Sequence, residues 1–145
     1  MSLDSTILKD FADESKQLLK ELETVVERLE VATGTFPEEL LTEFAQKIDR
    51  IMGAAKTLQL MDPSHLGLAS IGKLAELCKS IGYKAAEKKN LSLMPFFAAF
   101  WAETIETIDE LLDQLQNLAR TREIAESFPK VLQNRLAWLK ARIEK

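Results

Sequence analysis

Apolar residues recur with the period of an α-helix along almost the whole chain, and this pattern limits the fold more than any other feature. The only alternation with period two is Leu91-Ser92-Leu93, which is too short to predict a strand. Five glycines and four prolines in 145 residues are also few for a fold of short strands joined by many turns. The sequence therefore predicts an all-α protein without a sheet.

Start and stop signals divide the first half of the chain into three predicted helices. The first runs from about Asp4 to Glu30 and ends before the glycine of Ala32-Thr33-Gly34. Pro37, followed by two acids, predicts the first turn of a second helix, because proline needs no backbone donor there. Asp62-Pro63 predicts the start of a third helix, with the acid as N-cap and the proline at the first helical position.

The second half predicts two more helices. Pro95 opens a fourth helix with a near-heptad apolar pattern that continues as far as Leu118. A fifth follows Ser127-Phe128-Pro129, and the sequence leaves open whether residues 121–126 belong to the fourth helix or to the connection. Because the connections are short, neighbouring helices are expected to be antiparallel. We predict a single domain over residues 1–145, an up-and-down four-helix bundle with an additional C-terminal helix.

Composition excludes several classes of function. An apolar content of 46% and a charged content of 29% are ordinary for a soluble globular protein. The longest apolar run, from Leu93 to Ala102, is interrupted by Pro95 and predicts no membrane span. The first residues lack the basic and apolar regions of a signal peptide, so we expect a cytoplasmic protein. The net charge of −4 argues against binding to nucleic acid or to an acidic membrane.

The single histidine and the single cysteine leave little room for enzyme chemistry. His65 is expected near the start of the third helix, where a first-turn histidine is usually solvated. Cys78 has apolar neighbours and is expected to be a core thiol. There is no phosphate-binding glycine loop, no nucleophile with a plausible base and no metal-ligand spacing. We therefore expect no enzyme activity, no cofactor and no metal.

Two features at the C-terminal end each allow two interpretations. The aromatic residues of segment 95–101 exceed what one helix face can bury, so they form either core or a surface for a homodimer or partner, and Trp138 has the same ambiguity. Residues 120–145 carry seven bases and three acids, whereas residues 95–119 carry five acids and no base. The basic helix either packs beside its acidic neighbours, with exposed pairs that contribute little, or docks an acidic partner.

The segment from Ile48 to Leu60 does not fit a purely structural interpretation. At about 100° per residue, the apolar residues of the second helix point toward the core, and Asp49 points about 130° away from them. Gly53 lies on the same outer surface, although a glycine inside a helix costs about 1 kcal/mol relative to alanine. A small residue one turn after an exposed polar residue allows another molecule to approach the backbone. The predicted docking face consists of Ala45, Gln46, Met52, Gly53 and Lys56 around Asp49.

This segment resembles the phosphoacceptor helix of histidine-containing phosphotransfer (HPt) domains, including the N-terminal domain of bacterial chemotaxis kinases. In that family a histidine is followed by two residues, a lysine, a glycine, small residues, an apolar residue and often a second glycine. The matching residues here are Ile51, Gly53, Ala54, Ala55, Thr57, Leu58 and Leu60. The flanking segments 8–30 and 68–78 resemble the family's neighbouring helices, and the fifth predicted helix resembles the extra one of the chemotaxis-kinase domains. The resemblance covers about residues 4–118.

The chain departs from the family pattern at the residue that carries the chemistry. Asp49 occupies the phosphoacceptor position, Met52 replaces the lysine and Gln59 replaces the second glycine. A carboxylate is a poorer nucleophile toward phosphoryl groups than an imidazole and would form an acyl phosphate. The resemblance therefore implies a bacterial signalling module that docks a receiver or kinase domain without accepting phosphate. An aspartate there would imitate phosphohistidine only weakly, with one charge in place of about two. The alternatives are an oligomerisation or adaptor domain with no phosphorelay role, and phosphotransfer through Asp49 or His65.

Overall fold

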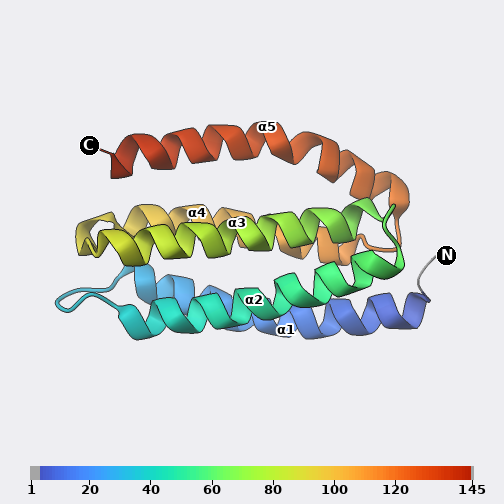
Figure 1. Cartoon of the computed structure of the whole chain (residues 1–145), viewed down its shortest axis with the longest axis horizontal. Helices are drawn as coiled ribbons and strands as arrows, with labels where there is room; N and C mark the ends of the chain where they lie inside the picture. Colours follow the sequence, from blue (N-terminus) through green and yellow to red (C-terminus); the bar gives the residue numbers. More distant parts are fainter. Residues whose placement is uncertain (1–3, 145) are drawn as a thin grey trace.

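The computed structural model describes residues 4–144 and contains five α-helices (Figure 1). They are α1 (Ser5–Glu30), α2 (Glu38–Met61), α3 (Leu66–Lys88), α4 (Met94–Asp113) and α5 (Leu118–Ile143), with a single 3₁₀ turn, η1 (Leu91–Leu93), before α4. Residues 4–144 form no strand. The prediction of an all-α protein is confirmed.

Helices α1 to α4 form a bundle in which each helix packs on two others. The neighbouring pairs are α1 with α2, α2 with α3, α3 with α4, and α4 with α1, and this closes the ring. The fifth helix lies outside the ring along α3 and α4, which are the two helices it contacts (Figure 1). Short connections make consecutive helices antiparallel, as predicted for a bundle with one additional helix.

The core is centred on Trp101 of α4, whose side chain is fully buried. Its indole ring lies 4.5 Å from the ring of Phe44 on α2 and 5.9 Å from that of Phe97, measured between centroids. The indole N–H donates to the carbonyl oxygen of Cys78 on α3 at 3.2 Å, so the one polar atom of the ring has a partner. Phe100 is buried as well. Three of the four aromatic side chains of segment 95–101 are therefore core, and the fourth, Phe96, is half-buried against Trp138 of α5, which favours the core interpretation.

The third helix begins later than predicted. Asp62 does not cap it, because α2 continues to Met61 and the Asp62 N–H donates to the Leu58 carbonyl as the C-cap of that helix. Pro63 follows in a turn that the His65 N–H closes onto the Asp62 carbonyl at 3.1 Å. Proline favours the second position of such a turn as strongly as the first turn of a helix, so the sequence signal was correct for a bend and wrong for the helix start.

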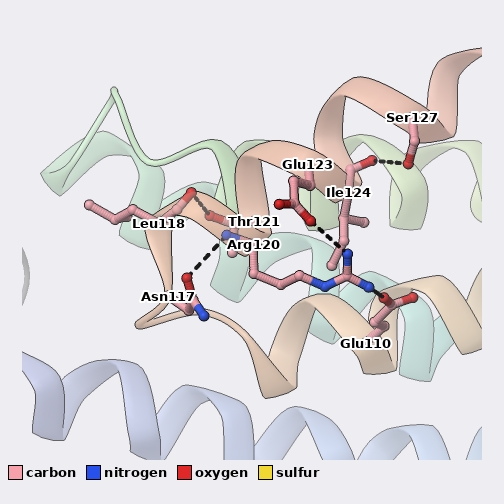
Figure 2. Close-up of polar contacts among 8 residues, drawn as sticks. All are labelled: Glu110, Asn117, Leu118, Arg120, Thr121, Glu123, Ile124 and Ser127. Atoms are coloured by element: carbon pink, nitrogen blue, oxygen red, sulfur yellow. Dashed lines mark hydrogen bonds and ion pairs between the residues drawn. The ribbon is translucent and has the colours of Figure 1, made fainter.

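The boundary between the fourth and fifth helices also differs from the prediction. Helix α4 ends at Asp113, and Leu115 is buried in the turn that follows. Helix α5 begins at Leu118, so residues 121–126 belong to it and Pro129 lies inside the helix instead of before it. The Asn117 side chain accepts a hydrogen bond from the Arg120 N–H at 3.1 Å and starts the helix without help from proline (Figure 2). Pro129 itself is exposed.

Candidate functional site

Asp49 lies on the outside of α2, as predicted, but it is not an isolated carboxylate. Lys79 of α3 donates to its Oδ1 atom at 2.7 Å, and the side chains of Lys79 and Asp49 keep 28% and 51% of their surface exposed. The hydrogen bond to Asp49 raises the pKa of Lys79 above its usual value, so the lysine stays charged and offsets the negative charge of the carboxylate. An external partner therefore meets an ion pair at this position.

One turn further along α2, Gly53 leaves open space above the helix backbone. It is exposed, and a β-carbon added to it would have no neighbouring atom within 4 Å. No packing contact within the bundle therefore requires glycine at this position. Helix α5 does not cover this position either, because it packs on α3 and α4.

Lys56 extends across to α3 instead of pointing straight into solvent. Its Nζ atom lies 3.2 Å from Oε2 of Glu76. Its aliphatic stem passes over Gly72, where an added β-carbon would meet the Lys56 Cγ atom at 3.4 Å. The side chain is thus ordered along the α2–α3 boundary by both its charge and its stem.

The remaining predicted residues of the face differ in how far they are exposed. Gln46 is exposed, whereas Ala45 is half-buried. Met52 is half-buried and packs against the core, so it contributes less to the outer surface than the helical projection predicted. Beside Ala45, residues at the start of α2 and the end of α3 line a groove. Tyr83, with 64% of its surface exposed, lies along this groove.

Sequence analysis missed the half of this surface that belongs to α3. Four residues on one stripe of α3 face the exposed side of α2 or line its groove: Gly72, Glu76, Lys79 and Tyr83. Their spacing of three or four residues is the helical signal that places them on one stripe. We call these four residues, together with Ala45, Gln46, Asp49, Met52, Gly53 and Lys56, the α2–α3 face.

His65 is buried, which contradicts the expectation of a solvated histidine. Only 4% of its surface is exposed, and it is the N-cap of α3. Its Nδ1 atom accepts from the Leu68 N–H at 3.2 Å, and its Nε2–H donates to the Leu115 carbonyl at 3.0 Å. Both ring nitrogens are engaged in one neutral tautomer, so the imidazole has no free atom with which to attack a phosphoryl group.

Cys78 is a core thiol, as predicted. Its side chain is fully buried, and this burial raises the pKa of the thiol to about 12. The side chain of Thr104 on α4 counteracts this rise of the pKa in part. A thiol with such a pKa is almost entirely protonated at neutral pH and is a poor nucleophile and metal ligand.

Two further properties bear on what the face can do. Among residues 4–144, no three histidine, cysteine, aspartate or glutamate side chains come together in a group that could hold a metal ion. None of the helices in that range has the length and apolar character needed to cross a membrane. The contacts of the α2–α3 face offer ion pairing, hydrogen bonding and close approach to the backbone at Gly53.

The basic residues of α5 are partly used within the fold. Arg120 contacts Glu110 of α4 at 2.6 Å and Glu123 at 2.9 Å, and Figure 2 shows its guanidinium between the two carboxylates. The hydrogen bond to Glu123 raises the pKa of Arg120 further above its usual value. Arg135 pairs with Glu103 of α4. These contacts favour the interpretation that the basic helix packs beside acidic neighbours.

Comparisons with known proteins do not identify a family: no family model matches the chain, and neither does any curated protein or solved structure.

Proposed function

We propose that this protein is an HPt-like signalling module that docks a receiver or kinase domain of a bacterial two-component system through its α2–α3 face and accepts no phosphate. The observation that carries the proposal is the position of Asp49. It lies in mid-helix on the exposed side of α2, one turn before a glycine with open space above it, and the resemblance to HPt domains gives this position to the phosphoacceptor. Both the family resemblance and the geometry of the face therefore point to the same surface.

The geometry at Asp49 supports docking without phosphotransfer. The 2.7 Å ion pair with Lys79 occupies one carboxylate oxygen and offsets the charge that would otherwise resemble a phosphoryl group. Mimicry of phosphohistidine is therefore not part of the proposal. A partner would instead use the backbone approach at Gly53, the groove beside Ala45 and the alternating charges of Lys56, Glu76 and Lys79.

The interaction is tested by measuring binding to a panel of purified receiver and histidine-kinase domains by biolayer interferometry. The variant Gly53→Arg places a long charged side chain in the open space and is expected to weaken binding at least tenfold. Gly53→Ala is the graded control: its methyl group meets nothing within the chain, and because it is much smaller than an arginine side chain it should weaken binding less than Gly53→Arg. Circular dichroism of both variants shows whether they are folded. Absence of binding by every domain, or equal binding by Gly53→Arg, contradicts the proposal.

Phosphotransfer itself is tested separately. The chain is incubated with a receiver domain phosphorylated with ³²P, and the label is followed on a gel. We expect no label on the wild type or on Asp49→Asn. Label on the wild type that disappears in Asp49→Asn would overturn the second half of the proposal and identify Asp49 as an acceptor.

A further inference from the structure

Helix α5 is attached to the bundle by a thin contact. Only four of its 26 residues are buried, whereas α1, of the same length, buries nine. The buried residues of α5 are Thr121, Ile124, Leu139 and Ile143. The ion pairs of Arg120 and Arg135 with α4 are exposed to solvent and contribute little to the attachment of α5. The helix therefore lies on a bundle whose other four helices already close on one another.

Helix α5 covers a groove on α3 and α4. Leu74 of α3 and two threonines of α4, Thr104 and Thr107, form its floor, and Phe128 and Leu132 of α5 lie over it. Near the end of the helix, the Trp138 ring lies 5.9 Å from Phe96 of α4 in an edge-to-face arrangement. The buried residues of α5 and its Trp138 contact hold the helix on this groove, and any second copy of the chain carries the same helix.

The turn between α4 and α5 has a sequence that is compatible with a helix. Gln114-Leu115-Gln116-Asn117 contains neither glycine nor proline, and the next proline is Pro129. The apolar pattern of α4 also continues through Leu115 and Leu118 without a change of period. Leu118 is 66% exposed in the folded turn, so this part of the pattern is not used within the single chain. A straight helix from α4 into α5 would satisfy the backbone without any substitution.

We propose that α5 exchanges between two copies of this protein, so that the groove on α3 and α4 of one copy receives α5 of the other. In the exchanged dimer the turn at 114–117 becomes helical, and every contact of α5 with the groove is formed again between copies. The free-energy difference between the closed chain and the exchanged dimer therefore depends mainly on the turn at 114–117. The closed chain keeps the Asn117 cap and the bond from His65 to the Leu115 carbonyl. The exchanged chain gains helical hydrogen bonds, one of which joins the Leu115 carbonyl to the Ala119 N–H.

Two exposed positions in the turn shift this balance in opposite directions. Asn117→Ala removes the cap of α5 and adds a strong helix former, so it favours the straight turn by about fivefold per chain and about 25-fold per dimer. Gln116→Gly weakens the straight helix by a similar factor and favours the closed chain. Light scattering coupled to size exclusion, over a range of protein concentrations, gives the fraction of dimer. We expect the fraction of dimer to be highest in Asn117→Ala, lower in the wild type and lowest in Gln116→Gly. The reverse order, or identical fractions, would overturn the proposal.

Cross-linking establishes whether a dimer is formed by exchange. In the double variant Glu103→Cys/Arg135→Cys the two thiols replace side chains that are paired between α4 and α5. A short bismaleimide is expected to join them within one chain in the monomer peak and between chains in the dimer peak, as resolved on a denaturing gel. Glu103→Cys alone is the control for accidental linkage, and the wild type shows that buried Cys78 does not react. Cross-links confined to single chains in the dimer peak, or no dimer in any variant, would refute exchange.

Discussion

His65 links the start of α3 to the turn between α4 and α5, and its replacement by alanine tests how much the bundle depends on that link. The imidazole is the N-cap of α3 through its bond with the Leu68 N–H, and it also satisfies the Leu115 carbonyl. Among the described residues, no backbone N–H in this turn donates to the Leu115 carbonyl. His65→Ala removes both bonds at once and leaves a buried space.

The expected loss follows from these two bonds. Loss of an N-cap costs about 1 kcal/mol of the free energy of unfolding. A buried carbonyl without a partner costs about 1–3 kcal/mol more. The sum of about 2–4 kcal/mol corresponds to a decrease in Tm of roughly 6–12 °C for a domain of this size. The substitution His65→Asn separates the two terms, because a short amide can cap α3 but cannot extend to Leu115.

Urea unfolding followed by circular dichroism at 222 nm measures both variants. We expect the free energy of unfolding of His65→Asn to be about 1 kcal/mol higher than that of His65→Ala, because the cap is kept. It should stay below that of the wild type by the cost of the unpaired Leu115 carbonyl. A loss below about 0.5 kcal/mol for His65→Ala would refute the reasoning. Equal losses in the two variants would show that the cap contributes nothing.

Three further predictions concern the core and the α2–α3 face. Cys78 should not react with a water-soluble disulfide reagent at pH 8 until the chain is unfolded. Above pH 9 the thiol of the unfolded chain ionises, whereas the native thiol stays protonated to about pH 12. The free energy of unfolding of the wild type should therefore fall relative to that of Cys78→Ala by up to about 1.4 kcal/mol per pH unit. Gly53→Ala should raise the free energy of unfolding by about 0.5–1 kcal/mol, because the position is helical and open; a loss in urea unfolding would indicate a neighbour that the structure does not show. Asp49→Asn should leave the urea midpoint nearly unchanged, since the ion pair with Lys79 is exposed. Ile48→Ala, at the adjacent and fully buried position, should lower the free energy of unfolding by about 2–5 kcal/mol. Similar losses at both positions would show that the helix face is wrongly assigned.

The sequence predicted the helices and their buried faces well because both depend on periodicity. Most apolar residues of the predicted α2 stripe are buried, and the two at its edges, Leu40 and Leu58, are half-buried against the core. Helix boundaries were less predictable where proline was the signal. Pro63 and Pro129 each suit more than one local structure, and the two helices begin instead at the N-caps His65 and Asn117, of which His65 also depends on the distant Leu115 carbonyl.

The candidate site was predictable only on one helix. The exposure of Asp49 follows from the period of α2 alone, and the structure agrees with it. Its partner Lys79 lies 30 residues further along the chain, and no local pattern indicates which residue of α3 meets which residue of α2. The burial of His65 was missed for the same reason, since the carbonyl to which it donates belongs to Leu115, 50 residues further along in the turn after α4.

The two tryptophans report on different parts of the molecule. Trp101 is sealed in the centre of the bundle, whereas Trp138 lies half-buried on α5 with the guanidinium of Arg142 4.2 Å from the centre of its ring. Their fluorescence should therefore separate under acrylamide quenching, with the emission of Trp138 quenched first. A red shift of that emission alone would record the release of α5 while the rest of the protein stays folded, without any added label.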